Sequence, residues 1–218
     1  MTNWAPTRDW VPLVGDFDGD GTDDIVVRHP ANGDWQVAVS DGRKFTPVGG
    51  SWLLNWATGS DWVPLVGNFS GGAQDDIVVW HPENGDWQVA VSDGTRFIPR
   101  GGSWLLNWAR GSGWIPLVGD FDGDGWLDVF IGNESTDPAD PDHCELYRNN
   151  RDGIFTECAK AVGIEIAEFV KGVGCADYDN DGRPDLYLSV RGERPKILLH
   201  NDGPDASGKW RFTDTAAK

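Results

Sequence analysis

The sequence repeats with a period of 52 residues, and this repeat restricts the possible folds more than any other feature. The six residues that start at Trp10 recur unchanged at Trp62 and with one substitution at Trp114. Between residues 10–54 and 62–106, 34 of 45 aligned positions are identical. A period of this size is typical of propellers and solenoids, in which each unit buries its core against a neighbour.

Each repeat predicts a meander of four β-strands. In the first repeat we expect strands at residues 10–15, 24–29, 34–40 and 44–48. The dipeptides Asn-Gly and Asp-Gly between the later strands favour tight hairpin turns. Four strands in about 50 residues make one propeller blade. The 218 residues therefore predict a single all-β repeat domain, a β-propeller-type array of about four four-stranded antiparallel blades, at approximately residues 3–54, 55–106, 107–160 and 161–218.

A nine-residue acidic loop joins the first two strands in three of the four repeats, at residues 16–24, 120–128 and 177–185. Carboxylates occupy loop positions 1, 3, 5 and 9, and a glycine occupies position 6. Carboxylates so close together repel one another unless a cation lies among them, and oxygen ligands at alternate positions suit Ca²⁺. The alternative, a solvated acidic turn, accounts for one copy but not for three in register. An EF-hand is excluded because loop position 12 is apolar and strand-forming residues follow.

These loops and the strands around them resemble the FG-GAP and VCBS repeat families. Residues 10–131 are similar to the Trp-rich bacterial FG-GAP type, and residues 145–156 and 176–182 are similar to the VCBS type. The resemblance implies calcium-binding propeller blades, with lectin-like propellers as relatives, and Ca²⁺ held by the carboxylates of positions 1, 3, 5 and 9 and the carbonyl of position 7. The implied ligands are Asp16, Asp18, Asp20, Thr22 and Asp24; Asp120, Asp122, Asp124, Trp126 and Asp128; and Asp177, Asp179, Asp181, Arg183 and Asp185.

The second repeat has lost this loop chemistry. Its loop starts with Asn68. Ser70 and Gly72 replace two carboxylates, and Ala73 replaces the glycine. Of the 11 differences between the first two repeats, five lie in this loop. We therefore predict three Ca²⁺ ions and an empty second-blade site at Asn68–Asp76.

The net charge of −17 limits the partners. With 18 basic against 35 acidic residues and no basic cluster, neither nucleic acids nor anionic membrane surfaces are expected partners. No stretch approaches 18 apolar residues, so membrane insertion is not expected, and residues 1–10 lack the pattern of a signal peptide. Calcium sites of millimolar affinity suit extracellular space. We expect a secreted or cell-surface protein whose signal peptide is not present in this chain.

Cys144 and Cys158 flank a hairpin turn predicted at residues 149–153. Their numbers are centred on residue 151, so we expect them to lie opposite each other, either joined by a disulfide or as two small buried residues. A disulfide would support an oxidising compartment. Cys175, in a predicted inner strand, is expected to be a packed free thiol.

Thirteen tryptophans recur largely in phase with the repeat. Their wide rings either fill the space between blades or form stacking platforms for sugars, as in the lectin propellers that this repeat type resembles. The candidates for ligand binding are Trp35 and Trp87, which follow Asn-Gly-Asp turns, with His29 and His81 nearby.

The sequence contains no G-x-S-x-G elbow, phosphate loop or H-E-x-x-H motif, so an enzyme is not expected. The carboxylate pairs are accounted for as metal ligands, and His143 and His200 have no partner visible in the sequence. Two non-enzymatic functions remain. The first is a calcium-binding extracellular module for glycan or protein recognition and adhesion. The second is a structural subunit that self-associates through blade edges into a larger ring or filament.

Overall fold

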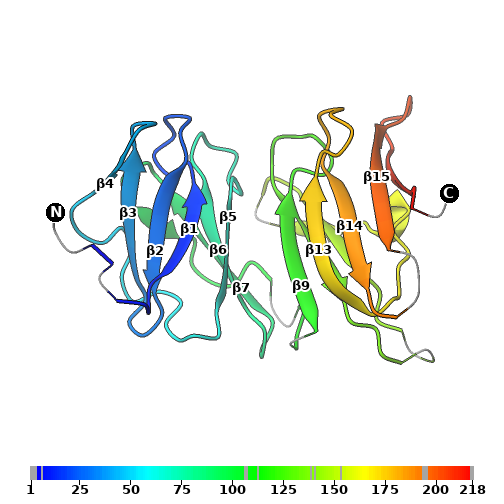
Figure 1. Cartoon of the computed structure of the whole chain (residues 1–218), viewed down its shortest axis with the longest axis horizontal. Coiled ribbons are helices and arrows are strands. Elements are labelled where there is room, and N and C mark those ends of the chain that lie inside the picture. The colour runs from blue at the N-terminus through cyan, green and yellow to red at the C-terminus, as the bar shows by residue number, and fades with distance from the viewer. Residues whose placement is uncertain are drawn as a thin grey trace. The chain divides into compact units, whose positions relative to one another are not determined.

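The computed structural model describes residues 4–5, 7–105, 108–111, 113–137, 139, 141–152, 154–192 and 196–216. They form four antiparallel sheets of four strands each, so the predicted all-β array of four-stranded blades is confirmed. The chain divides into two compact units, Met1–Arg110 and Gly111–Lys218, with two blades in each (Figure 1). We number the blades 1 to 4 in chain order. That all four belong to a single domain stays a prediction, and some of its expected boundaries, at residues 3, 106 and 107, lie outside the described residues.

The two blades of the first unit have the same layout. Blade 1 consists of β1 (Val11–Gly15), β2 (Asp24–His29), β3 (Asp34–Ser40) and β4 (Phe45–Pro47). Blade 2 consists of β5 (Val63–Gly67), β6 (Asp76–His81), β7 (Asp86–Ser92) and β8 (Phe97–Pro99). Spatial order follows chain order, and the first residue of the second strand pairs with the last residue of the first. The acidic loop therefore connects two paired strands, as its sequence predicts.

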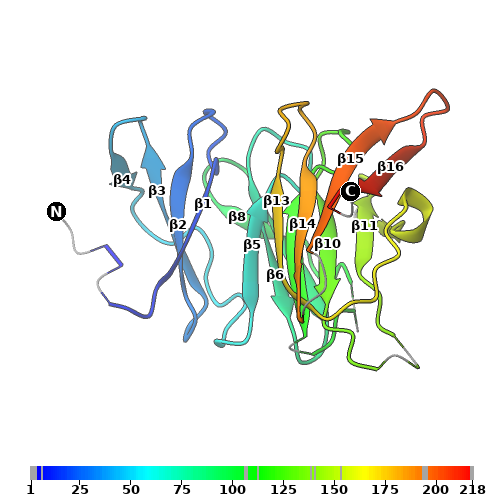
Figure 2. The same ribbon diagram turned by 45° about the vertical axis from the view of Figure 1, so that its right-hand side comes forward.

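The second unit also contains two blades (Figure 2). Blade 3 consists of β9 (Trp114–Gly119), β10 (Asp128–Asn133), β11 (Glu145–Asn149) and β12 (Phe155–Glu157). Blade 4 consists of β13 (Val170–Ala176), β14 (Asp185–Val190), β15 (Ile197–Pro204) and β16 (Trp210–Asp214). A short 3-10 helix, η1 (Lys160–Val162), follows β12 and contacts β16.

Each unit joins its two blades through the same pair of contacts. In the first unit, Phe97 lies edge-on to Phe17 with ring centroids 5.5 Å apart, and the Ser92 hydroxyl donates to the Phe17 carbonyl at 2.7 Å. In the second unit, the Phe212 and Phe121 rings are 6.3 Å apart, and the Asn201 side-chain amide donates to the Phe121 carbonyl at 2.8 Å. Aromatic rings at loop position 2 thus close the core between neighbouring blades, which is the packing role expected of a repeat array.

The hairpin that contains the first two cysteines has a different register from the one predicted. Asn149 pairs with Phe155, which centres the turn on residue 152. The Cys158 N–H consequently donates to the Leu146 carbonyl at 2.8 Å, and the Cys144 N–H donates to a residue outside the hairpin. The prediction that the two cysteines lie opposite each other is wrong.

The physical reason for the shift is the turn around Asp152. Its carboxylate accepts the N–H of Ile154 at 3.0 Å, which carries the turn one residue past the predicted end at residue 153, itself outside the described residues. Cys144, Cys158 and Cys175 are all free. Cys175 packs against the core of the second unit, as expected.

Candidate metal centres

The last Asp of the loop is a buried structural residue in every blade. The four side chains, Asp24, Asp76, Asp128 and Asp185, are at most 2% exposed. One carboxylate oxygen of each accepts the backbone N–H of loop position 2 at 3.0–3.1 Å, and the other accepts a backbone N–H of the third strand at 2.8–2.9 Å. The loop is therefore tied to the third strand without an ion, which explains why blade 2 keeps Asp76.

Burial has the expected electrostatic effect on these carboxylates. Desolvation raises the pKa of Asp24 and Asp76, and it raises the pKa of Asp128 to about 8. A nearby cation favours the ionised form of a carboxylate and offsets this penalty. Blades 1 and 3 thus place a buried acid where a bound cation would stabilise its charge.

In each of three loops, carboxylates of that loop gather around a point of their own. Ligand oxygens of positions 1, 3 and 9 lie within 4.8 Å of one another in each of three groups: Asp16, Asp18 and Asp24; Asp120, Asp122 and Asp128; and Asp177, Asp179 and Asp185. The backbone of the same loop orients the first Asp. In blade 1 the Asp16 carboxylate accepts three N–H groups, from Gly19, Asp20 and Gly21, at 2.8–3.1 Å. Each group could hold a divalent cation with oxygen ligands.

Position 5 is arranged differently from positions 1, 3 and 9. One oxygen of Asp20, Asp124 and Asp181 accepts the backbone N–H of position 7, that is of Thr22, Trp126 and Arg183, at 2.8–3.0 Å. In blade 3 the other Asp124 oxygen forms an ion pair with Arg151 at 2.9 Å. In blade 4 the guanidinium of Arg183 donates to Asp181. That position 5 and the carbonyl of position 7 are ligands stays a prediction.

The loop of blade 2 closes on itself through an amide side chain. The Asn68 Nδ2 group donates to the Gly72 carbonyl at 2.7 Å, and its Oδ1 accepts the Gly71 N–H at 2.7 Å. Gly72 stands where blade 1 has the carboxylate of position 5. A hydrogen bond across the loop thus spans the interior that an ion would occupy, while the empty second site itself stays a prediction.

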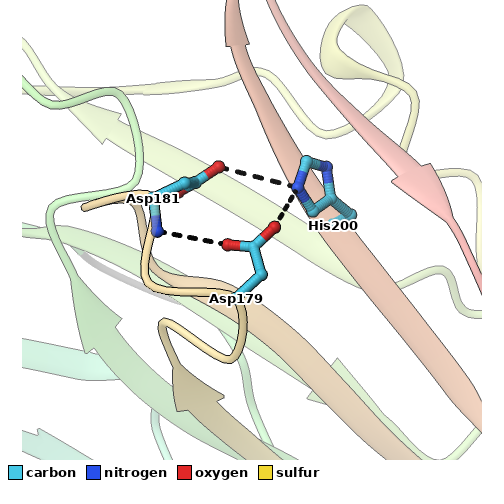
Figure 3. Close-up of side chains that lie close together, drawn as sticks. All are labelled: Asp179, Asp181 and His200. Carbon is cyan, nitrogen blue, oxygen red and sulfur yellow. Dashed lines mark hydrogen bonds and ion pairs between the residues drawn. The ribbon is translucent and has the colours of Figure 1, made fainter.

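His200 on β15 is a neighbour of the fourth loop that sequence reasoning left without a partner. Its Nε2 lies 3.0 Å from Asp179 Oδ2 and 3.6 Å from Asp181 Oδ2 (Figure 3). Its Nδ1 lies 2.9 Å from Asp202 Oδ1, and the hydrogen bond with Asp202 is the main cause that raises the pKa of His200. The one signal in the sequence is that His200 precedes Asn201, the third-strand residue that binds the buried Asp185.

The prediction that Trp35 and Trp87 bind a ligand by stacking is wrong. Their side chains are 0% and 2% exposed, so neither ring offers a face to a sugar. The reason is that each indole folds over the chain that follows its blade: the Nε1 groups donate to the carbonyls of Trp56 and Trp108 at 3.2 and 3.4 Å. The alternative expectation, that these rings pack inside the protein, applies to both positions.

The two histidines proposed beside them also pack against tryptophan. His29 lies edge-on to Trp10 and His81 edge-on to Trp62, with ring centroids 4.9 and 5.0 Å apart. Both are only partly exposed, and their Nδ1 atoms are buried without a hydrogen-bond partner. That these histidines contact a ligand stays a prediction.

Two adjoining hollows lie beside η1 and the β15–β16 hairpin of the second unit. Their volumes are about 460 and 290 Å³, and they share Ala161, Pro204 and Lys209. The larger one is lined by charged side chains of both signs: Lys160, Glu165, Asp202, Asp205, Lys209 and Arg211. Side chains of this kind can hydrogen-bond a polar ligand from several directions.

Known proteins match this chain over different lengths. Cartilage acidic protein 1 of Xenopus tropicalis is 31% identical over 93 residues, which is 42% of this chain and 13% of that protein. A lectin of Agrocybe aegerita, solved for its specific recognition of non-reducing terminal N-acetylglucosamine, superposes with a TM-score of 0.65 at 22% identity, over 95% of this chain and 52% of the lectin chain. The Tc holotoxin pore of Photorhabdus luminescens superposes with a TM-score of 0.57 at 18% identity, over 90% of this chain and 9% of that chain.

The chain thus spans about half of the lectin and much less of the other two. At these identities the two solved structures show the fold alone, a propeller-type arrangement of blades. Among the described residues, no helix has the length and apolar character to cross a membrane. A family model described as an FG-GAP-like repeat matches residues 120–188, from the first Asp of the blade 3 loop to just past the blade 4 loop. The resemblance read from the sequence is confirmed over this segment, which matches the model of an FG-GAP-like repeat.

Proposed function

We propose that this protein is a non-enzymatic recognition module whose blades are stabilised by Ca²⁺. The observation that carries the proposal is the recurrence of one oxygen-ligand arrangement, a cluster of three carboxylates within 4.8 Å, at the same loop in blades 1, 3 and 4. Hard oxygen ligands on a flexible loop suit Ca²⁺ better than softer metals. An ion at each cluster would link the first hairpin of the blade to the buried Asp that binds its third strand.

Titration calorimetry tests the number and identity of the ions. We expect three equivalents of Ca²⁺ per chain, and thermal unfolding shifted to higher temperature by Ca²⁺ and to lower temperature by a chelator, because an ion that binds only the folded state adds to its stability. Asp18→Asn should remove one equivalent, whereas Asn68→Ala should remove none. Four equivalents, or no binding, would contradict the proposal.

We propose a glycan as the ligand class. Support comes from the lectin with the same fold and from the charged hollow beside η1. Lys209 and Arg211 line it together with Asp202 and Asp205, a mixture of donors and acceptors that matches the hydroxyl groups of a sugar. A glycan array with the Ca²⁺-loaded protein should give specific binding, which the double change Lys209→Ala and Arg211→Ala abolishes. Arg96→Ala, an exposed change in the first unit, is the control. Binding that survives the double change would place the ligand elsewhere.

We also propose that the protein acts outside the cell or at its surface. The similarity to a protein named for cartilage and the calcium chemistry of the loops support this location. Detection of the native protein in the culture medium or on intact cells would test it, and recovery only from lysed cells would contradict it.

A second candidate function, assembly from several copies, is favoured by two uncovered blade faces. Phe97 of blade 2 is 3% exposed because it packs against Phe17 and Trp52 of blade 1. Its counterpart in blade 1, Phe45, is 50% exposed, and Val14, on the first strand of the same blade, is 58% exposed. Blade 1 therefore presents the same apolar face that blade 2 buries.

Blade 4 presents the complementary face. Position 2 of its loop is Tyr178, which is 46% exposed, whereas Phe17, Phe69 and Phe121 at the same position are at most 1% exposed. Tyr187 on the same blade is also 46% exposed, and both tyrosines line one apolar hollow. We infer that Phe45 of one copy packs against Tyr178 of a second copy, as Phe97 packs against Phe17.

Sedimentation of the Ca²⁺-loaded protein tests the assembly. We expect a dimer or larger ring that Phe45→Glu disrupts, while Thr46→Glu, on the neighbouring exposed residue, leaves it intact. A monomer at every concentration would exclude this function and leave the recognition module untouched.

A further inference from the structure

We propose that blade 4 contains a second kind of metal site, in which His200 Nε2 and the carboxylates of Asp179 and Asp181 bind a transition-metal dication such as Zn²⁺. The ligand atoms of these three residues lie within 4.8 Å of one another. The site shares Asp179 with the oxygen cluster of the loop, but its nitrogen ligand comes from β15. It does not depend on Ca²⁺ being bound in the loop.

The distances agree with a tetrahedral metal. Zinc–nitrogen and zinc–oxygen bonds of about 2.1 Å place neighbouring ligand atoms about 3.4 Å apart. Nε2 of His200 lies 3.0 Å from Asp179 Oδ2 and 3.6 Å from Asp181 Oδ2, so the two separations bracket this value. Figure 3 shows both carboxylates turned toward the same ring nitrogen. The three side chains are 20–36% exposed, which leaves a path for an ion and for a fourth ligand, water.

A third carboxylate, that of Asp202, orients the histidine for this role. Asp202 Oδ1 lies 2.9 Å from Nδ1, and Asp202 Oδ2 accepts the Thr213 hydroxyl at 2.5 Å. With the proton on Nδ1, the lone pair of Nε2 points at two carboxylates, an arrangement that is repulsive unless a cation or proton lies between them. Metal-binding histidines are typically held in this way by a carboxylate on the other ring nitrogen. Imidazole nitrogen selects zinc and similar metals over calcium.

The charge of the cluster leaves room for two ions. Five carboxylates (Asp177, Asp179, Asp181, Asp185 and Asp202) stand against the guanidinium groups of Arg183 and Arg211, for a net charge of −3 with neutral His200. A loop Ca²⁺ leaves about −1, so the cluster still attracts a second cation. Because Arg183 donates to the same Asp181 oxygen and is anchored on the Asn201 carbonyl at 2.7 Å, Asp181 is the weaker of the two carboxylate ligands.

The other blades provide an internal comparison. The third-strand residue before the one that binds the buried Asp is Val39 in blade 1, Val91 in blade 2, Arg148 in blade 3 and His200 in blade 4. The arginine side chain carries a permanent charge and cannot ligate a metal. The valine side chain carries no charge and also cannot ligate a metal. Of these four side chains, only that of His200 can ligate a metal. His200→Arg therefore converts blade 4 to the chemistry of blade 3 and keeps a positive charge at this position.

The test is titration of the folded protein with Zn²⁺, in excess Ca²⁺ and again without Ca²⁺. We expect one equivalent of Zn²⁺ in both conditions and a shift of the His200 Nε2 resonance in the nitrogen NMR spectrum. His200→Arg should abolish this equivalent, and Asp202→Asn should weaken it by about 10- to 100-fold. His143→Ala, a change of an exposed histidine, should leave it unchanged. Circular dichroism checks that each variant folds, and His200→Gln replaces His200→Arg if the latter does not.

Equal Zn²⁺ binding by the wild type and the His200 variant would overturn the proposal, since the ion would then sit in the oxygen clusters. Absence of Zn²⁺ binding would also overturn it and assign His200⁺ the counter-ion role that Arg148 can play in blade 3. A wild type that binds no Ca²⁺ but binds one Zn²⁺ that His200→Arg abolishes would contradict the proposed function and support this site.

Discussion

Blades 1 and 2 have almost the same sequence and different loop chemistry. They share 34 of 45 aligned residues, and their strands have the same register. In blade 1 the Asp16 carboxylate collects three backbone N–H groups and stands beside Asp18 and Asp24. In blade 2 Asn68 donates to Gly72 across the loop.

The comparison separates two roles of the loop carboxylates, hydrogen bonding to the backbone and gathering of ligand oxygens. The position 9 carboxylate, Asp24 or Asp76, satisfies the same two backbone N–H groups in both blades. The carboxylates of positions 1, 3 and 5 are present in blade 1 and absent from blade 2, and those of positions 1 and 3 belong to the cluster of blade 1 that could hold an ion. A repeat can therefore lose the loop carboxylates of positions 1, 3 and 5 and keep its fold, provided that the buried Asp remains and an internal hydrogen bond shapes the loop.

The buried carboxylates give the largest expected effect. Asp76→Ala leaves two buried backbone N–H groups without an acceptor, at about 1–3 kcal/mol each, so we expect roughly 2–6 kcal/mol of lost stability. Asp24→Ala should cost the same in the presence of a chelator and more in Ca²⁺, because it also removes an ion. Urea unfolding of both variants in the two conditions measures this difference. Unequal losses of stability for Asp24→Ala and Asp76→Ala in the presence of the chelator would contradict the claim that both blades use the position 9 carboxylate in the same way.

Restoring the missing loop carboxylates of blade 2 tests the comparison most directly. Replacing the five differing loop residues of blade 2 with those of blade 1 (Asn68→Asp, Ser70→Asp, Gly72→Asp, Ala73→Gly and Gln74→Thr) should create a fourth calcium site. At a free Ca²⁺ concentration about 100 times Kd, the added ion contributes about 2.7 kcal/mol. Calorimetry should then count four equivalents in place of three. If the count stays at three, residues outside the loop decide whether the ion binds.

The sequence predicted features that depend on residues close together along the chain. The strands β2 and β3 begin and end where expected, because period-2 patterns and Asn-Gly turns are local signals. The carboxylate clusters of blades 1, 3 and 4 also form from residues within nine positions. The same locality makes the missing loop carboxylates of blade 2 visible in the sequence.

Features that depend on distant residues could not be predicted. His200 is 21 positions from Asp179, and only the pairing of β14 with β15 brings them together. Burial of Trp35 depends on the chain near Trp56 folding back over it. Arg28 is another case: it is 1% exposed and donates to backbone carbonyls near residues 57–62, while blade 2 has Trp80 at the same position. A single turn residue, Asp152, shifted the cysteine hairpin.

A single substitution should separate the two ways of shaping the loop. Asn68→Asp removes the donor to the Gly72 carbonyl and supplies no complete ligand set, so we expect a loss of about 1 kcal/mol that Ca²⁺ does not rescue. Asp16→Asn in blade 1 should lower stability in Ca²⁺ and change it little with a chelator. Thermal unfolding of the two variants in both conditions distinguishes these patterns. Rescue of Asn68→Asp by Ca²⁺ would show that one carboxylate is enough to restore the site.

The smallest expected effect lies in the turn between the third and fourth strands. In blade 2 the Thr95 hydroxyl, followed by the Thr95 N–H, the Arg96 side chain and the Arg96 N–H, lowers the pKa of Asp93 to about 2. Blade 1 has Arg43 and Lys44 at these positions, and Asp41 accepts only backbone N–H groups there.

Since the folded pKa of Asp93 is below the ordinary value of 3.8, its contribution to stability is present above pH 3.8 and is lost as the pH falls toward 2. Thr95→Arg together with Arg96→Lys should raise this pKa toward that of Asp41, measured by NMR titration of the carboxyl carbons. The change in unfolding free energy should be small, because the turn is exposed and solvent screens its charges. An unchanged pKa would mean that the backbone alone fixes the acidity of Asp93, and the turns of the two blades would then be equivalent.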